Sequence, residues 1–460
     1  MSLGCRDGAT CGSEVVTAKN AFHRVEKLLS DCMTELASLS TFEGEDSAAI
    51  AKMIYESMTT SGRVYHGMQH VFDISKNMKD PILLLSALFH DVIYISIDKR
   101  FSEDQTRFLE GVLVPNTQQL TLAETFEDPL VDMVVRLYGV TPGEELPKSG
   151  TNEFLSALIG VRAMSRWLSV PHLMEIAACI EATIPFRPIV DGKSPMDRLY
   201  DRLKAVCPDQ SEEWLEATVR KSAMTANCDL CSFDSTDRDF FLDSSWKLIP
   251  EARPILLNED CPLSEFLKEL HALEGRSKFL KGAVPNIFQS FRQAPSDKEL
   301  AEKQRRTHKN LDIMCEYAKV RMLQTMVLVE FVEAMGEDPN SVPLMSCLLM
   351  DVPQVEEVSV DTLTSVEQEI RNWLVCGRRT SFYWDPAMSP LGAYLFDSLG
   401  TKGISEAIEI GKNQQAGSHK LLKYLPESVV CTVASRLGAV FTDRADRILQ
   451  VPEELGILAR

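Results

Sequence analysis

The stretch Ile82-Leu83-Leu84-Leu85-Ser86-Ala87-Leu88-Phe89-His90-Asp91 is the most informative part of the chain. Its apolar run predicts a buried helix, and an imidazole and a carboxylate stand where that run ends. Burying two such polar groups costs desolvation free energy unless they pair with each other or bind a cation. The stretch therefore predicts a helical core with a polar site attached to it.

Helical spacing extends over the rest of the 460-residue chain. Apolar residues recur at intervals of three and four in segments 15–36, 48–58, 154–167, 173–180 and 311–335. The period-two alternation of half-buried strands is scarce. The sequence thus predicts an all-α protein, with a length that suits one large or two ordinary domains.

The charge and the cysteine content limit which binding partners and which cellular compartment we expect for the protein. The chain carries 48 Lys and Arg against 67 Asp and Glu, a formal net charge of −19. Such an acidic chain is disfavoured as a binder of nucleic-acid backbones or anionic membranes, which need a basic surface. We expect no transmembrane span and no signal peptide, and the 12 scattered cysteines are typical of reduced thiols. A cytoplasmic protein is expected.

The histidines indicate where the chemistry is. Three of the eight in the chain are His66, His70 and His90, and His90 is followed by Asp91. On a helix, His66 and His70 project from one face because they are four residues apart. A single histidine on an apolar helix is usually a hydrogen-bonded core residue, but two such polar pairs together favour a metal site. This set needs a further ligand, and Asp229 is a candidate, although taken alone it is more readily an ordinary helical aspartate.

The order of a histidine, a His-Asp pair and a distant aspartate resembles that of the HD superfamily of helical metal-dependent phosphohydrolases. Tyr65-His66, His70 and Asp73-Ile74 are similar to a metal-site segment of class I cyclic-nucleotide phosphodiesterases. A group of predicted HD phosphohydrolases is more similar still. Its motifs correspond, in order, to Arg63 to His70, Phe89 to Tyr94, Asn152-Glu153 with Ser156-Ala157, Ile180 to Thr183, Asp229-Leu230, and Gly275-Arg276 through Leu280 to Ile287-Phe288.

The resemblance covers about residues 46–292 and implies an HD-domain helical bundle. We expect this domain at 13–292, with an insertion at about 95–150 that forms a lid or extra helices. Residues 298–460 are expected to form a helical accessory region, and the apolar stripe at 311–335 leaves a homodimer open. Besides this insertion, the chain differs from similar proteins in a second way. No histidine follows Thr183 in 184–187, where similar proteins tend to have one.

Carried over residue by residue, the resemblance assigns four metal ligands, His70, His90, Asp91 and Asp229. They would bind one divalent ion, of manganese, zinc, nickel, iron or magnesium, and Asp91 could bridge to a second ion. Water activated by the metal would attack phosphorus, which makes Asp91 catalytic as well as a ligand. His66 would protonate the leaving oxygen, or would itself be a ligand.

Four further residues are candidates for contacts with the substrate. Arg63 and Arg187 carry guanidinium groups that suit a phosphate, although each could equally be an ion-pair partner. Thr183 could hydrogen-bond a ligand group, with an intrahelical bond to a preceding carbonyl as the alternative. Glu153 could be a base or could support a ligand.

The function expected from these residues is metal-dependent hydrolysis of a phosphoric ester in a small metabolite or nucleotide. A non-catalytic HD protein that binds a metal or ligand is the first alternative. A di-iron oxygenase is the second, although it needs additional histidine ligands. The substrate should be a small phosphorylated molecule, because the acidic chain disfavours polynucleotides.

Overall fold

The computed structural model describes residues 18–37, 45–115, 117–343, 363–382, 384–415 and 417–458. Across these residues the regular structure is helical and strands are absent; only isolated β-bridges occur, such as that between Leu113 and Leu122. The prediction of an all-α protein is confirmed. None of the helices in these segments is both long enough and apolar enough to cross a membrane.

The chain forms two compact units. The first holds the described residues up to Asp234 together with Ala283–Thr307, and the second holds Ser235–Gly282 together with the described residues from His308 onward. The sequence predicts one domain at 13–292, whereas the segment Ser235–Gly282 groups with the second unit.

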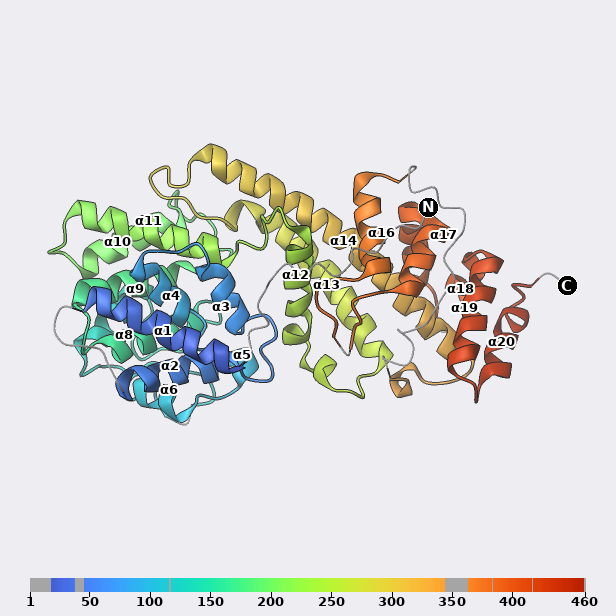
Figure 1. Ribbon diagram of the computed structural model, residues 1–460, viewed down its shortest axis with the longest axis horizontal. Coiled ribbons are helices and arrows are strands. Elements are labelled where there is room, and N and C mark those ends of the chain that lie inside the picture. The colour runs from blue at the N-terminus through green and yellow to red at the C-terminus, as the bar shows by residue number, and fades with distance from the viewer. Residues whose placement is uncertain are drawn as a thin grey trace. The chain divides into compact units, whose positions relative to one another are not determined.

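The first unit contains the helices coloured blue to green in Figure 1. These are α1 (Ala18–Leu36), α2 (Glu45–Met58), α3 (Met68–Ser75), α4 (Pro81–Phe89), α5 (Ile95–Asp98), α6 (Glu103–Phe108), α7 (Pro129–Tyr138), α8 (Thr151–Met164), α9 (Val170–Ala182), α10 (Pro195–Val206) and α11 (Glu212–Asp229).

Helix α4 contains the apolar run Ile82 to Phe89, and it lies in the core of the first unit. Asp80 caps its start by accepting a hydrogen bond from the N–H of Ile82 at 2.8 Å, and Pro81 supplies the preset φ of a first helical residue. The helix packs against α1, α8 and α9. The backbone of α8 approaches α4 closely, since a Cβ added at Gly160 would lie 3.2 Å from the ring of Phe89.

The expected insertion at about 95–150 folds onto this core as the short helices α5 and α6, an irregular stretch and α7. Helix α6 begins with a capping box in which Ser102 and Gln105 satisfy each other's backbone N–H groups. Gln105 is also buried and donates from its side chain to the carbonyl of Val92 at 2.9 Å. The insertion is therefore hydrogen-bonded to the backbone at the residue that directly follows the His-Asp pair.

The second unit contains most of the long helix α14 (Asp297–Ala334), whose first residues belong to the first unit. Apolar residues of the stripe at 311–335, such as Leu311, Leu323 and Phe331, are buried within the unit. The other helices of this unit are α12 (Arg238–Ala252), α13 (Leu263–Ala283), α16 (Ser365–Cys376), α17 (Pro390–Lys412), α18 (Lys420–Tyr424), α19 (Glu427–Val440) and α20 (Ala445–Glu454), with 3-10 turns at Pro254–Leu257 and Pro339–Ser341, whereas the 3-10 turn Val284–Asn286 belongs to the first unit.

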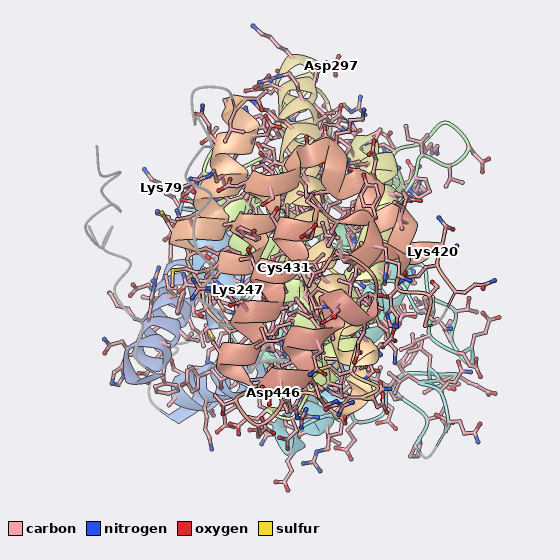
Figure 2. All side chains as sticks on the ribbon, turned by 90° about the vertical axis from the view of Figure 1, so that its right-hand side faces the viewer. Lys79, Lys247, Asp297, Lys420, Cys431 and Asp446 are labelled. Carbon is pink, nitrogen blue, oxygen red and sulfur yellow. The ribbon has the colours of Figure 1, made fainter. Side chains whose placement is uncertain are left out.

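A buried ionic cluster lies in the core of the second unit. Asp385 is fully buried, pairs with Arg321 and with Arg378, and accepts a hydrogen bond from the indole of Trp246 at 2.6 Å. Arg378 also donates to the hydroxyl of Tyr317 at 2.7 Å. Charges of both signs also cover the surface of this unit, as Lys420 and Asp446 show in Figure 2.

Candidate metal centre

Three helical segments of the first unit converge on one polar site. His70 lies on α3, His90 and Asp91 directly follow α4, and Asp229 is the last residue of α11. These three helices pack against one another. Asp229 comes from a segment 159 residues after His70, yet the two side chains meet.

The polar atoms of these four residues face one another at short distances. His70 Nε2 lies 3.0 Å from Asp229 Oδ1, and His90 Nε2 lies 2.9 Å from Asp91 Oδ2. The cross distances are 3.5 Å from His90 Nε2 to Asp229 Oδ1 and 3.8 Å from His70 Nε2 to Asp91 Oδ2. With metal–ligand bonds of about 2.1 Å, neighbouring ligand atoms stand about 3.0–3.4 Å apart, so these spacings suit one ion.

Two buried atoms of the site have no hydrogen-bond partner among the described residues. They are His90 Nε2 and Asp91 Oδ2, which face each other without hydrogen-bonding geometry. The other ring nitrogen, His90 Nδ1, lies 2.9 Å from the carbonyl oxygen of Ala87. If Nδ1 carries the proton and donates to that carbonyl, the lone pair of Nε2 points into the site. His70, His90 and Asp91 can therefore bind a metal ion.

Charge pairing holds these groups together in the absence of a cation. Burial would lower the pKa of His90, but the charges of Asp91 and Asp229 raise it well above its usual value. Burial would raise the pKa of Asp229, but the imidazoles of His70 and His90 lower it to about 2. The pKa of Asp91 is likewise held well below its usual range, mainly by His90. A metal ion would replace the proton on His90.

His66 lies beside this cluster, in the turn before α3. Its ring centroid is 5.7 Å from that of His70, in an edge-on arrangement, and 4.4 Å from that of Tyr94. The side chain is half-buried. The structure therefore brings His66 next to a candidate ligand, His70.

Glu153, on α8, is electrostatically coupled to the cluster. Burial is the main cause that raises the pKa of its carboxyl to about 7, and the negative charges of Asp91 and Asp229 add to this effect. At neutral pH this carboxyl can both accept and donate a proton. Its backbone carbonyl accepts a hydrogen bond from the hydroxyl of Tyr138 at 3.0 Å.

The guanidinium of Arg63 makes its hydrogen bonds and its ion pair with groups of the protein. Its guanidinium donates to the backbone carbonyls of Asp91 and Val92, and it pairs with Asp98 through Nε at 3.0 Å and through Nη2. Asp98 also accepts hydrogen bonds from Thr60 and from the N–H of Tyr94. Arg63 thus holds the backbone on which a candidate ligand stands, which differs from the substrate contact that we expected.

Two more of the four expected substrate contacts, Arg187 and Thr183, also have protein partners. Arg187 pairs with Glu181, a buried carboxylate that also pairs with Arg202. Thr183 donates from its hydroxyl to the carbonyl of Ile180 at 2.8 Å, the intrahelical alternative. Neither residue has a contact with the four candidate ligands among the interactions of the described residues.

Three residues in or next to the matched motifs, for which the sequence predicts no role, hydrogen-bond to the backbone of neighbouring segments. Asn152 and Ser156 accept hydrogen bonds from the N–H groups of Ile95 and Ile93, at 3.1 and 3.0 Å. Asn227, two residues before Asp229, pairs twice with the backbone of Gln289, at 2.8 and 2.7 Å.

Sequence reasoning missed Asp98 and the place of Tyr65, whose ring lies 4.7 Å from that of His70. Tyr65 belongs to the first motif, which was the available signal; nothing in the local sequence marked Asp98. The segment from Gly275 to Leu280 is part of the second unit.

Comparison with known proteins gave no support from homology: no family model, no curated protein and no solved structure matches the chain.

Proposed function

We propose that this protein is a metal-dependent phosphoric ester hydrolase of the HD type that acts on a small phosphorylated molecule. One observation carries the proposal: His90 Nε2 and Asp91 Oδ2, both buried and without a hydrogen bond to a described residue, lie 2.9 Å apart within reach of His70 and Asp229. Burial of such atoms without hydrogen bonds is costly, and one bound cation would satisfy both of them.

His70, His90, Asp91 and Asp229 would hold the ion. Two imidazoles and two carboxylates suit manganese, zinc, nickel or iron better than magnesium, which prefers oxygen ligands. When bound, a divalent ion supplies Lewis acidity, which lowers the pKa of water and offsets negative charge on phosphoryl oxygens.

The protein's own residues would manage the protons. His66 lies on the side of the cluster toward Tyr94 and is placed to donate a proton to a leaving alcohol. The carboxyl of Glu153, with its pKa raised to about 7 by burial, could accept a proton from attacking water. Arg63 keeps the backbone of Asp91 in place through its carbonyl.

The test is metal analysis of the purified protein together with His90→Ala and Asp229→Ala, followed by a panel of small phosphoesters with the metal found. We expect near-stoichiometric metal in the wild type and in the control His23→Ala, whose imidazole is exposed on α1, and loss of metal in both site variants. Phosphoester turnover should disappear with the metal.

Three results would contradict the proposal in different ways. A wild type that takes up none of manganese, zinc, nickel or iron would sink it. Metal without turnover across the panel would favour the non-catalytic HD protein, and two irons per chain would favour the oxygenase.

A further inference from the structure

The buried ionic cluster in the core of the second unit carries more positive than negative charge. The guanidiniums of Arg321 and Arg378 share one carboxylate, that of Asp385, and all three side chains are at most 1% exposed. An arginine keeps its charge inside a protein, so neither guanidinium can become neutral by releasing a proton. One positive charge is therefore left uncompensated by this carboxylate, and such a charge is costly to bury.

Two other groups beside Arg378 do not remove this charge. A second buried carboxylate, that of Asp243, interacts with Arg378 but already pairs with Lys247 at 2.8 Å. Asp243 also accepts two hydrogen bonds from Thr380, at 2.8 and 2.9 Å. The ring of Trp246 lies 5.0 Å from Cζ of Arg378 and attracts it, although an aromatic ring has no net charge. Neither group can serve as the missing anion.

Three buried donor atoms of the cluster also lack a partner. Arg321 Nε, Arg378 Nε and Gln324 Nε2 have no hydrogen bond with any described residue. Each of these nitrogens carries hydrogen, so the group that would satisfy them is an acceptor. Buried polar atoms without a partner are few in native proteins, and an absent water or ion is a common reason for them.

The orientation of the Gln324 amide is fixed by its oxygen. Gln324 Oε1 accepts from Arg321 Nη1 at 3.0 Å and from the hydroxyl of Ser389 at 2.5 Å. A reversed amide would place its nitrogen against the arginine N–H, where two donors would face each other. The backbone of α17 also approaches closely here, since a Cβ added at Gly392 would lie 3.1 Å from Oε1. The amide nitrogen must therefore find its acceptor on its other side.

We propose that a small monovalent anion, of the chloride type, binds in this core beside Arg321, Arg378 and Gln324. A buried water molecule could accept hydrogen bonds from the same donors, but it would leave the positive charge uncompensated. An anion satisfies the donors and the charge together. It acts as a structural ligand of the second unit, and its binding is linked to folding because the unfolded chain has no such site. The inference does not depend on the proposed function.

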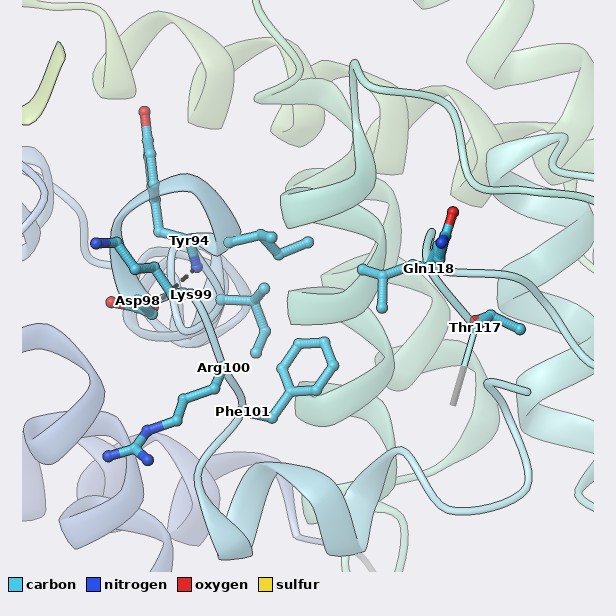
Figure 3. Close-up of a pocket in the computed structure, with 10 residues that line it drawn as sticks. Tyr94, Asp98, Lys99, Arg100, Phe101, Thr117 and Gln118 are labelled. Carbon is cyan, nitrogen blue, oxygen red and sulfur yellow. Dashed lines mark hydrogen bonds between the residues drawn. The ribbon is translucent and has the colours of Figure 1, made fainter. Parts of the chain in front are cut away.

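The cavity of about 220 Å³ in the first unit lacks this combination. It is lined largely by apolar side chains such as Phe101 and Leu120, and the charged ends of Lys99 and Arg100 point away from it (Figure 3). Both of these cations are exposed, so solvent can hydrate them. None of the described residues that line this cavity has a buried polar atom without a partner. The buried donors of the second unit therefore give the stronger indication of a ligand.

The experiment measures chloride binding to the full chain, first by equilibrium dialysis against radioactive chloride and then by thermal unfolding. Gluconate, which is too large for a closed core, replaces chloride at constant ionic strength, so that screening stays the same. The test variant is Gln324→Glu, which has the same shape and keeps an oxygen for Arg321 and Ser389, but puts a charged acceptor in place of the unpartnered donor. The matched control is Gln368→Glu, the same substitution at an exposed position on α16.

We expect one bound chloride per chain in the wild type and in the control, and a higher unfolding midpoint in chloride than in gluconate. Gln324→Glu should lose the bound chloride, and its midpoint should not respond to chloride. A wild type that binds no chloride and unfolds at the same temperature in both salts would overturn the inference, whether or not the variant folds. Chloride binding that persists in Gln324→Glu, or that disappears in the control, would also overturn it.

Discussion

Arg63 offers the sharpest test of how the site is held, and we predict that Arg63→Met both destabilises the first unit and weakens metal binding. The guanidinium is fully buried and pairs with Asp98, whose side chain is 12% exposed. It also donates to the carbonyls of Asp91 and Val92. Methionine has a similar length but removes all of these donors.

The expected loss in the free energy of unfolding follows from the buried charge of Asp98, which the substitution leaves without its arginine. Removing one partner of a buried ion pair costs about 3–5 kcal/mol, because the other charge stays buried. Asp98 keeps its hydrogen bonds with Thr60 and with the N–H of Tyr94, which puts the expected loss near the lower limit, about 3 kcal/mol. Groups that orient metal ligands typically change metal affinity by about 10–100-fold, and we expect a loss in this range.

The assays are urea unfolding of the metal-free protein and manganese titration. Arg166→Met is the matched control, because Arg166 is exposed and lies 3.5 Å from an exposed partner, Asp46. The control should change the free energy of unfolding by less than about 1 kcal/mol.

Asp98→Asn completes a double-mutant cycle with Arg63→Met, in which the two effects should be non-additive by at least about 1 kcal/mol. Unchanged unfolding and unchanged manganese affinity in Arg63→Met would refute the reasoning.

Four further predictions follow from other contacts in the structure. The charges of Asp91 and Asp229 outweigh burial and raise the pKa of His90 in the metal-free protein, so manganese must displace a proton from this imidazole. The affinity for manganese should therefore rise about tenfold per pH unit below that pKa. A constant affinity in titrations between about pH 6 and 8 would contradict this. The same raised pKa should stabilise the metal-free fold fully below about pH 6.5, with the stabilisation lost as the pH rises through the folded value, as unfolding at several pH values would show. Asp385→Ala should destabilise the second unit by about 3–5 kcal/mol, since it leaves two buried arginines without their carboxylate, and a denaturation midpoint equal to that of the wild type would argue against this. Gly160→Ala should cost about 1–3 kcal/mol, because its Cβ would lie 3.2 Å from the ring of Phe89, and thermal unfolding would measure it.

The helical fold could be predicted from the sequence because apolar spacing along a helix is a local property. The run that ends at Phe89 predicted α4, and the stripe at 311–335 predicted the long helix α14. The division into units could not be predicted in the same way. Helix α14 continues across the boundary at Thr307, so no turn residue or change of spacing marks it.

The site shows the same contrast between local and long-range information. His70, His90 and Asp91 stood out because polar groups end or interrupt apolar helices. Asp229 was an ordinary helical aspartate until a resemblance gave it weight, and its carboxylate lies 3.0 Å from His70.

The ion-pair partners of the two arginines could not be predicted from the sequence, because tertiary packing brings Arg63 to Asp98 and Arg187 to Glu181. A guanidinium looks the same in sequence whether it faces a phosphate or a buried carboxylate.

The short segment from His90 to Asp98 connects these features, because its residues contact several parts of the site. It carries two candidate ligands, the ring of Tyr94 beside His66, and the carboxylate that pairs with Arg63. A change at one position is therefore expected to shift several of these groups together. Effects of substitutions on metal affinity and on stability should be non-additive within this segment, and double-mutant cycles will separate them.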